Sequence, residues 1–465
     1  MNKELFFLWD KIDKNTFYIE DHEQRVFKKD IDVQIKKMID DLISIADWEN
    51  RKVYIDIKDN KLFIIMLISL FKLKSKVVLV PSEVNIEDYY YKEGLFISDN
   101  KEYKNLIFLQ NDLKLKLYED FDPDKFESPV KDNDTIVYLY TSGSTGKSKL
   151  IPKTALNLIY EVKELNKILS ITKDDIFFFT PPLCHIYGFL FGFLLPIYSS
   201  SKIVLDNRFT PDSIAKFVKK KKITIFISIP TYYRMFADLN LIDNFIQCRK
   251  LTSSSAPLPQ DVSEKFYKKG IKITEVYGST ETGGIAYRVS AVNLEWKLFS
   301  YVKIFEKWDD YIENKKGEKD RREVELRINS PAISINYNKE IGFNTGDIIQ
   351  FTENGTFKLL GRNTRFIKIA GKRVDLNYVL EKVKDYLAQN IDCEIKDEEL
   401  YVGEKDEKIY VIFEKEFPKS SKEIKNDLNK HLPSYAVPRL LISKKIPRNN
   451  MGKINKVEIE KILNI

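Results

Sequence analysis

A run of small, hydroxyl and basic residues, TSGSTGKS at positions 141–148, has the chemistry of a loop that holds phosphate. Its two glycines allow the backbone to turn N–H groups toward an anion, and its hydroxyls and lysine add further donors. The residues expected to contact phosphate are Thr141, Ser142, Gly143, Ser144, Thr145, Gly146 and Lys147. An ordinary connection between a strand and a helix is the alternative, although such connections rarely hold an unbroken run of these residue types.

The spacing of the loop argues against the P-loop, whose two glycines lie five positions apart before a lysine. The residue five positions before Gly146 is Thr141, and Gly143 lies too close. A P-loop ATPase or kinase is therefore a rival that explains this segment poorly.

A second motif, VYGSTETGG at residues 276–284, brings glycines, hydroxyls and a carboxylate together after a predicted strand. Tyr277 offers a flat ring on which a base can stack. Thr280 and Glu281 carry hard oxygen atoms that suit Mg²⁺. A plain turn at a strand end is the alternative, and it explains the glycine pair better than the whole segment.

Three shorter motifs follow nearer the C-terminus, and each is ambiguous alone. Asp347 follows a Thr-Gly turn, where a carboxylate can accept two ribose hydroxyls, although Gly-Asp is also a common turn pair. Arg362 begins a basic segment and could meet phosphate or ribose, because a guanidinium is planar and always charged. Lys453 follows a glycine on a predicted tight turn, which would deliver one positive charge to a site.

The elements that must position these motifs predict an α/β fold. TIVYLY at 135–140 predicts a buried strand before the first motif, and residues 155–169 predict an amphipathic helix after it. Further short strands are predicted at 53–57, 77–80, 176–180, 202–205, 223–228 and 272–277, with helical segments between several of them. This alternation predicts a large N-terminal domain with mainly parallel sheets flanked by helices.

The composition changes near residue 305 and again after Gly361. About a hundred residues then remain, which suffices for a small α/β unit. We therefore expect a large domain over residues 1–361 and a small, mobile C-terminal α/β domain over residues 362–465.

The chain as a whole has the composition of a globular protein. Of its 465 residues, 43% are hydrophobic and 31% are charged, and the net charge of +7 does not demand nucleic acid. The apolar run at 62–71 is too short to span a membrane and is expected to be a core helix. Three scattered cysteines and three histidines argue against a disulfide framework and a histidine metal site, and a cytoplasmic location is expected.

Together, in this order and spacing, the motifs resemble the adenylate-forming superfamily, which includes acyl- and aryl-CoA synthetases, luciferases and the adenylation domains of nonribosomal peptide synthetases. The segments that carry the resemblance are YTSGSTGKSK (140–149), YGSTET (277–282), TGD (345–347), GR (361–362), HLPSYAVPR (431–439) and PRNNMGK (447–453). The resemblance implies an ATP-dependent acid–thiol ligase. Such an enzyme adenylates a carboxylic acid, releasing pyrophosphate, and then transfers the acyl group to a thiol, releasing AMP.

The resemblance also implies roles for single residues. The implied nucleotide contacts are the phosphate loop, Tyr277 at adenine, Thr280 and Glu281 at Mg²⁺, and Asp347 at the ribose with Arg362 nearby. Gly278 is also among the implied nucleotide-binding residues. Lys453 would bridge the substrate carboxylate and the α-phosphate, and would be the main catalytic residue of the first half-reaction. His185, Thr280 and Glu281 would assist it.

In this family the C-terminal domain rotates between the two half-reactions about a hinge that is usually Asp or Lys. The matching position here is Thr364, a departure that bears on the thioester half-reaction. Lys368 and Gly371 match the segment that faces the site during that second step.

The resemblance places the acid pocket at PPLCHIYGF, residues 181–189, where no carboxylate is present to pair with an α-ammonium group. An α-amino acid is therefore disfavoured, and an aryl acid or a short acyl chain is expected. His185 would lie near the substrate carboxylate, with a satisfied buried histidine as the alternative, and Tyr187 would form the far wall. The other expected pocket residues are Gly283 and two serines that stand where the family has glycine and alanine, Ser254 and Ser255.

The accepting thiol is that of CoA or that of the phosphopantetheine on an acyl or aryl carrier protein, because both present the same reacting group. A small excess of basic charge suits the phosphates of CoA and an acidic carrier protein alike. A non-catalytic homologue that binds nucleotide is the alternative function.

Overall fold

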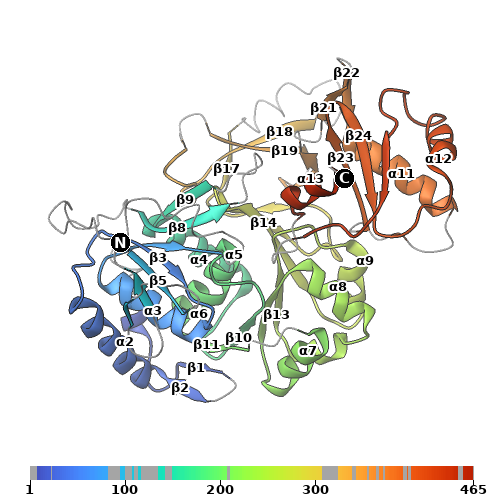
Figure 1. Ribbon diagram of the computed structural model, residues 1–465. Coiled ribbons are helices and arrows are strands. Elements are labelled where there is room, and N and C mark those ends of the chain that lie inside the picture. Colours follow the sequence, from blue (N-terminus) through green and yellow to red (C-terminus); the bar gives the residue numbers. More distant parts are fainter. Residues whose placement is uncertain are drawn as a thin grey trace. The chain divides into compact units, whose positions relative to one another are not determined.

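The computed structural model confirms the predicted α/β class (Figure 1). It describes residues 8–21, 24–81, 95–99, 107–108, 114–116, 135–141, 149–206, 210–305, 323–337, 342–352, 355–362, 366–369, 372–390, 395, 399–448 and 454–463. The chain divides into two compact units. The first comprises Met1–Lys303 with Asn329–Phe343, and the second comprises Ile304–Ile328 with Asn344–Ile465.

The first unit contains a seven-stranded sheet with the order β6-β7-β5-β3-β4-β8-β9. Its strands are β3 (Lys52–Asp56), β4 (Lys76–Leu79), β5 (Leu95–Ser98), β6 (Ile107–Phe108), β7 (Lys114–Lys116), β8 (Thr135–Thr141) and β9 (Lys149–Thr154). The central pairs are parallel, whereas β8 and β9 are antiparallel. The predicted phosphate loop therefore connects two paired strands, and not a strand and a helix as the sequence suggested.

The second sheet of this unit has nine strands in the order β16-β15-β14-β13-β12-β10-β11-β1-β2. Its strands are β1 (Tyr18–Glu20), β2 (Arg25–Phe27), β10 (Ile176–Phe179), β11 (Lys202–Val204), β12 (Ile225–Ser228), β13 (Lys250–Ser253), β14 (Ile273–Ser279), β15 (Gly283–Arg288) and β16 (Lys297–Leu298). In sheet order, the neighbouring strands from β14 to β1 are parallel. The edge strand β2 at one side and β15 and β16 at the other pair antiparallel with their neighbours. The prediction of mainly parallel sheets is thus confirmed.

Local sequence signals explain where two central helices begin and end. α4 (Ala155–Leu169) begins with a capping box, in which Thr154 Oγ1 accepts from Asn157 N at 3.2 Å and Asn157 Oδ1 accepts from Thr154 N at 3.0 Å. It ends at Ser170, whose φ of 51° is left-handed. α3 (Asn60–Lys72) is buried from Phe63 to Phe71, which confirms the predicted core helix.

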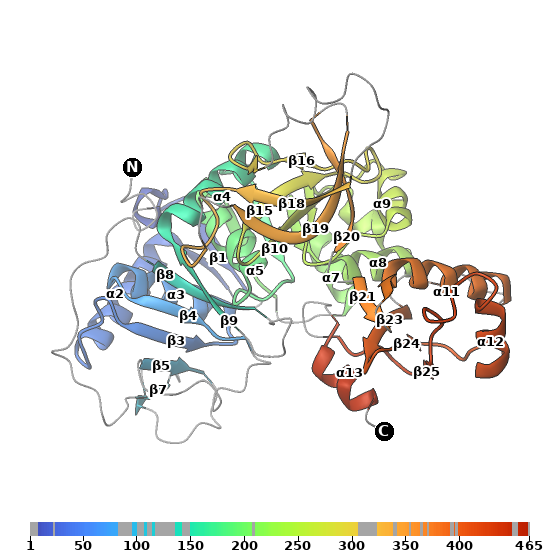
Figure 2. The ribbon, with the colours of Figure 1, turned by 90° about the horizontal axis from the view of Figure 1, so that it is seen from above.

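The remaining helical segments of the first unit cover the two sheets (Figure 2). They are η1 (Trp9–Lys11), α2 (Lys28–Ile43), α5 (Ile186–Gly188), η4 (Phe189–Leu194), α6 (Leu195–Ser199), α7 (Pro211–Lys220), α8 (Pro230–Asp238), η5 (Ile242–Phe245) and α9 (Gln260–Tyr267). Aromatic side chains fill the core that joins α7, α8, η5 and α9 to the nine-stranded sheet.

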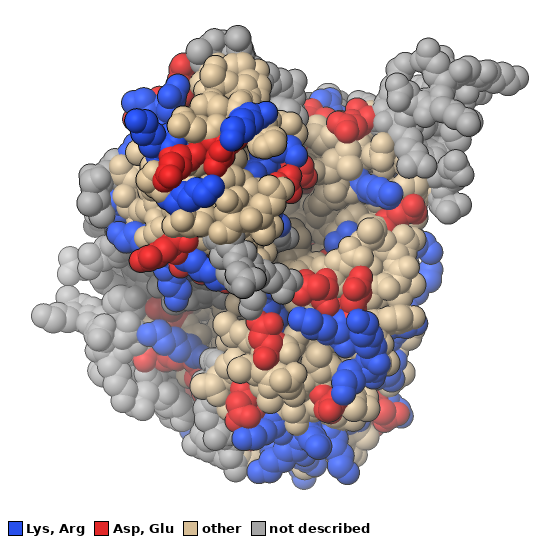
Figure 3. Space-filling model, turned by 90° about the vertical axis from the view of Figure 1, so that its right-hand side faces the viewer, with Lys and Arg blue, Asp and Glu red and all other residues tan. Residues whose placement is uncertain are grey.

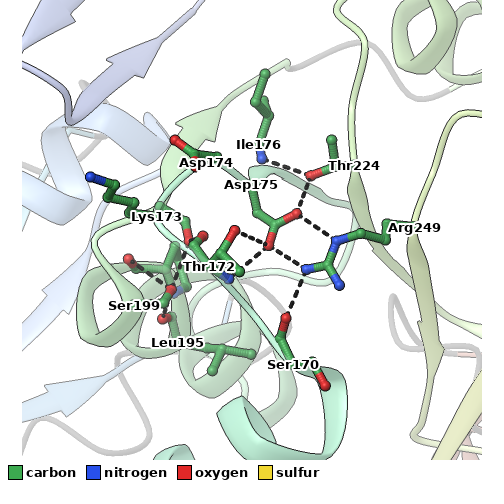
Figure 4. Close-up of polar contacts among 12 residues, drawn as sticks. Ser170, Thr172, Lys173, Asp174, Asp175, Ile176, Leu195, Ser199, Thr224 and Arg249 are labelled. Atoms are coloured by element: carbon green, nitrogen blue, oxygen red, sulfur yellow. Dashed lines mark hydrogen bonds and ion pairs between the residues drawn. The ribbon is translucent and has the colours of Figure 1, made fainter.

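A buried aspartate ties together the amino-terminal ends of three neighbouring strands of the nine-stranded sheet (Figure 4). Asp175 precedes β10, and its carboxylate accepts from Thr224 Oγ1 at 2.8 Å and from Arg249 Nε at 3.1 Å. Thr224 precedes β12, and Arg249 precedes β13. Burial would raise the pKa of Asp175, but hydrogen bonds from Arg249, Thr172 and Thr224 outweigh it and lower that pKa.

The second unit contains three small sheets, ordered β17-β18-β19-β20, β21-β22 and β23-β24-β25. Their strands are β17 (Lys303–Ile304), β18 (Glu323–Asn329), β19 (Phe343–Phe351), β20 (Phe357–Arg362), β21 (Phe366–Ile369), β22 (Lys372–Asp375), β23 (Leu400–Lys405), β24 (Lys408–Phe413) and β25 (Leu440–Ser443). The helices are α11 (Leu376–Asn390), α12 (Ser421–Leu428) and α13 (Lys456–Leu463). One core cluster of this unit draws its members only from residues 367–441, but the boundary at residue 362 stays a prediction.

The surface carries charges of both signs. On the face in Figure 3, lysines and arginines alternate with aspartates and glutamates, and basic side chains gather most densely at its lower edge. This mixture agrees with the small net charge of +7. Among the helices that the structure describes, none is long and apolar enough to cross a bilayer.

Candidate functional site

The carboxyl-terminal edge of the nine-stranded sheet gathers three of the predicted segments. The acid-pocket segment follows β10, Ser254 and Ser255 follow β13, and Tyr277 lies near the end of β14. Because β10, β12, β13 and β14 are parallel neighbours, these segments leave the sheet at the same edge. Ligands of open α/β sheets bind outside this edge, so the structure brings the predicted pocket residues to the expected place.

The turn between β14 and β15 is locked by its own hydroxyl groups. Ser279 N donates to Thr282 Oγ1 at 3.1 Å, and Thr282 N donates to Ser279 Oγ at 3.2 Å. Thr282 is buried, with 1% of its surface exposed. Thr280 and Glu281 lie between these two residues, and both are half-buried.

The donor set of this turn fits Mg²⁺. Within the described chain, no hydrogen bond or ion pair engages the Glu281 carboxylate or the Thr280 hydroxyl, and no cluster of three or more His, Cys, Asp or Glu side chains occurs. Mg²⁺ usually takes one or two protein carboxylates and completes its shell with substrate phosphates and water. One carboxylate and one hydroxyl are therefore sufficient, provided that a phosphate ligand supplies the rest.

Tyr277 and Gly278 lie at an irregularity in the β14–β15 pair, where the register shifts. A Cβ on Gly278 would lie 2.2 Å from Gly283 O, so the close approach of the two strands requires glycine there. The half-buried ring of Tyr277 lies 5.6 Å from the ring of Trp296, at 55° to it.

Trp296 was not predicted as a site residue, and further contacts fix its position. Arg288 lies 4.3 Å from the Trp296 ring and pairs with both carboxylate oxygens of Glu275, at 2.9 and 3.1 Å. Trp296, held in this way by Arg288 and Glu275, supports the ring of Tyr277. The sequence held no signal for it, because the link depends on how β14, β15 and β16 pair.

The two aromatic residues of the predicted acid pocket have different surroundings. His185 is half-buried and caps α5, with its N–H donating to Pro182 O at 3.2 Å. Tyr187 is buried, and its hydroxyl bonds to Ser228 O at 3.1 Å and to Thr252 Oγ1 at 2.9 Å. Burial raises the pKa of Tyr187 far above its usual value, so its phenol stays protonated.

The two serines after β13 differ in what the structure shows of them. Ser254 Oγ donates to Val276 O at 2.8 Å and so ties the end of β13 to β14. Ser255 has a φ of 78°, a left-handed conformation that is uncommon for a residue with a side chain. Gly283 has a φ of 70°, which glycine adopts without strain.

In the second unit, Asp347 is buried, with 4% of its surface exposed, and its N–H donates to Thr345 Oγ1 at 3.1 Å. Asp347 and Arg362 are register partners across β19 and β20, so the structure brings these two predicted ribose residues together.

The structure describes the remaining predicted residues only in part. For Arg362 and Lys368 it gives only the position in a strand, and Thr141 is the last residue of β8. The predicted residues outside the described chain are Ser142, Gly143, Ser144, Thr145, Gly146, Lys147, Thr364, Gly371 and Lys453.

The model of a known protein family, described as AMP-binding enzyme, matches residues 70–317. The chain belongs to this family. The match includes the predicted phosphate loop, the acid-pocket segment and the β14–β15 turn, and it confirms the resemblance to adenylate-forming enzymes. The motifs of Asp347, Arg362 and Lys453 lie beyond the matched residues.

Three curated relatives show the range of similar proteins. The chain is 25% identical to bacitracin synthase 1 of Bacillus licheniformis over 415 residues, covering 83% of this chain and 8% of that protein. It is 26% identical to human mitochondrial malonate–CoA ligase over 377 residues, covering 70% and 65%. It is 25% identical to the 2,3-dihydroxybenzoate-AMP ligase of Bacillus subtilis over 378 residues, covering 76% and 69%. The chain thus spans less than two thirds of the length of the first two.

Among solved structures, the chain is similar to ATP-bound MatB from Rhodopseudomonas palustris. The TM-score is 0.76 at 16% identity, with 99% of each chain covered. At that identity the likeness shows the shared fold alone.

Proposed function

We propose that the protein is an ATP-dependent carboxylic acid–thiol ligase. In the first step a carboxylate oxygen bonds to the α-phosphorus of ATP, and the bond to the leaving pyrophosphate breaks. In the second step a thiolate attacks the acyl carbon, so that a thioester forms and AMP leaves. The observation that carries this proposal is the locked β14–β15 turn of an AMP-binding enzyme, where the Thr280 and Glu281 side chains have no hydrogen-bond partner in the described chain.

Adenylyl transfer needs alignment and charge stabilisation more than covalent help from the protein, and the candidate residues suit that need. Mg²⁺ bound by Thr280 and Glu281 would supply positive charge at the phosphates. The loop at 141–147 would hold the leaving pyrophosphate, and Tyr277 would stack on adenine. Asp347 with Arg362 would hold the ribose, and Lys453 would contact both the carboxylate and the α-phosphate.

The acid is an aryl acid or a short acyl acid, and not an α-amino acid. Support comes from the segment 181–189, which contains no carboxylate to pair with an ammonium group. The segment is also rich in apolar side chains, and the ring of Tyr187 within it lies 4.7 Å from the ring of Phe191. Of the relatives, one is named for malonate and one for 2,3-dihydroxybenzoate, which are a short diacid and an aryl acid.

The thiol is that of CoA or of a carrier-bound phosphopantetheine, and the mixed surface charge suits either. Lys368 and Gly371 are the residues that we assign to this second step, with Thr364 as the hinge. A malonate–CoA ligase among the relatives favours CoA.

Product analysis tests this function. The protein is incubated with ATP, Mg²⁺, CoA and a panel of acids, and the nucleotides are separated by chromatography. We expect AMP and pyrophosphate, and a loss of at least tenfold in rate for Glu281→Gln, since an amide binds Mg²⁺ poorly. Glu264→Gln on α9 is the control, because the Glu264 carboxylate accepts an exposed hydrogen bond from Gln260 Nε2 at 2.8 Å and has no other hydrogen bond among the described residues.

Two other outcomes would contradict the proposal. Release of ADP in place of AMP would favour a P-loop ATPase or kinase. Nucleotide binding without turnover of any acid would favour a non-catalytic homologue.

A further inference from the structure

Two ionisable side chains lie fully buried behind the β14–β15 turn. Lys153 on β9 is 0% exposed, and Glu161 on α4 is 1% exposed. Both belong to the elements that directly follow the loop at 141–148. Removing two such charges from water is costly, so their placement needs a reason beyond packing.

Glu161 meets the turn at its two glycines. Its Oε1 accepts from Gly284 N at 2.7 Å, while its Oε2 is buried and has no hydrogen-bond partner in the described chain. A Cβ on Gly283 would lie 2.6 Å from Glu161 Oε1, so the carboxylate reaches the turn only because that residue is glycine. Burial raises the pKa of Glu161, and the charge of Lys153 and the Gly284 N–H oppose this rise.

Lys153 meets the same turn from another side. Its Nζ donates to Ala332 O at 2.7 Å and, more weakly, to Glu281 O at 3.5 Å. Ser334 N donates to the same Glu281 carbonyl at 2.8 Å, and Ser334 Oγ donates to Pro152 O, also at 2.8 Å. The backbone of Glu281 is therefore held by β9 and by the segment at 331–334 together.

Further hydrogen bonds fix the frame around these two side chains. Asn157 Nδ2, in the first turn of α4, donates to Pro331 O at 2.6 Å and to Ile333 O at 3.1 Å. Tyr301 Oη donates to Gly284 O at 3.0 Å. Both peptide groups of Gly284 are thus fixed, one by a carboxylate and the other by a phenol.

We propose that Lys153 and Glu161 are positioning residues for the adenylation step. They hold the backbone from Glu281 to Gly284 in one conformation, so that the Thr280 and Glu281 oxygens are preorganised for Mg²⁺–ATP. This inference rests on the proposed function only for the identity of the ligand, Mg²⁺–ATP. Its structural part, that Lys153 and Glu161 hold the turn in one conformation, does not depend on that function. Outer residues that orient metal ligands typically contribute roughly 10–100-fold to metal affinity or activity.

The structural part is tested without any ligand. Hydrogen–deuterium exchange of the segment 276–288 is measured in the wild type, in Glu161→Gln and in Glu164→Gln. Glu164 lies one turn further along α4, and its carboxylate accepts from Ser300 N at 2.8 Å at the surface. We expect faster exchange of the segment only in Glu161→Gln, and equal exchange in all three proteins would overturn the inference.

The functional part is tested by the Mg²⁺ dependence of adenylation. Glu161→Gln should raise the Mg²⁺ concentration for half-maximal rate by roughly 10–100-fold, with little change in KM for the acid. Lys153→Met should also raise the Mg²⁺ concentration for half-maximal rate. The double variant of Glu161→Gln and Lys153→Met should show a smaller rise than either single variant, because it leaves no uncompensated buried charge. A lower melting temperature with an unchanged Mg²⁺ dependence would reduce the pair to a merely structural role and overturn the inference.

The two proposals fail in different ways. If the wild type forms no adenylate with any acid, the proposed function fails, and hydrogen exchange still decides whether Glu161 holds the turn. If the wild type is active and Glu161→Gln matches it in both measurements, only the positioning inference fails. Should Lys153→Met not fold, the double variant, which contains no buried charge at this place, carries the comparison with Glu161→Gln.

Discussion

The Tyr187 hydroxyl is held by Ser228 and Thr252, whereas the Thr280 and Glu281 side chains make no hydrogen bond to any described residue. This contrast separates groups that maintain the fold from the two groups that we propose as ligand contacts. A buried hydroxyl that already donates and accepts has little capacity for a substrate, so we assign only the ring of Tyr187 to the proposed pocket.

The change Tyr187→Phe tests this assignment. Losing the hydroxyl leaves Ser228 O and the buried Thr252 hydroxyl with fewer partners, and it should cost about 1–2 kcal/mol in the free energy of unfolding. KM for the acid should stay close to that of the wild type. Urea unfolding and steady-state kinetics measure the two effects, and a large rise in KM at unchanged stability would show that the hydroxyl contacts the substrate.

Gly283→Ala probes the backbone beneath the candidate metal ligands. A left-handed residue with a side chain costs roughly 1–2 kcal/mol, and crowding against the Glu161 carboxylate should add about 1–3 kcal/mol. Gly270→Ala is the matched control, because Gly270 has a φ of 79° but open space around its Cβ position. In denaturant unfolding, the free energy of unfolding should be considerably lower for Gly283→Ala than for Gly270→Ala. Equal losses of this free energy in the two variants would mean that Glu161 does not crowd position 283.

At the scale of elements, the strands carry two sets of polar groups at opposite ends. Asp175, Thr224 and Arg249 join the amino-terminal ends of β10, β12 and β13 (Figure 4). The candidate site occupies the carboxyl-terminal ends. The Asp175 cluster therefore holds in place the strands that carry the candidate site at their other ends.

Asp175→Asn should therefore destabilise the protein by roughly 1–3 kcal/mol at pH 7. The pKa of Asp175 is lowered in the folded state, so its contribution is present above the ordinary value of 3.8 and is lost as pH falls through the lower folded pKa. The neighbouring Asp174, whose side chain is 82% exposed, provides the control Asp174→Asn. Unfolding free energies measured between pH 7 and pH 2 should converge for Asp175→Asn and the wild type, and parallel curves would contradict this account.

Elements with strong local signals could be predicted from the sequence, and those without them could not. The helix at 155–169 was predictable because apolar residues recur at helical spacing, and the α3 core helix because its run is uniformly apolar. β9 escaped prediction because Pro152 lies within it, which only an edge strand such as β9 tolerates. η4, a π-helix, lies in an apolar run without periodicity.

The residues of the candidate site also fall into those that the sequence could predict and those that it could not. Tyr277, Thr280 and Glu281 were predictable because their chemistry lies in one short motif. Trp296, Lys153 and Glu161 reach the site through tertiary contacts, and their spacing in the sequence carries no corresponding signal.

At the scale of the whole molecule, the proposed chemistry draws on both compact units. The family match at 70–317 includes the phosphate loop and the β14–β15 turn, whereas Asp347 and Lys453 belong to the second unit. The roles that we propose in adenylyl transfer are therefore assigned to residues of both units. A change in either unit should then abolish the same partial reaction.

ATP–pyrophosphate exchange, measured across aryl, acyl and amino acids, tests this claim most directly. We expect exchange with an aryl or a short acyl acid in the wild type, and its loss by at least a hundredfold in Lys453→Ala, since one positioned charge at the transferring phosphate contributes several kcal/mol. Binding of Mg²⁺–ATP, followed by calorimetry, should survive in this variant. Exchange that persists in Lys453→Ala, or an absence of exchange with every acid although Mg²⁺–ATP binds, would contradict the account.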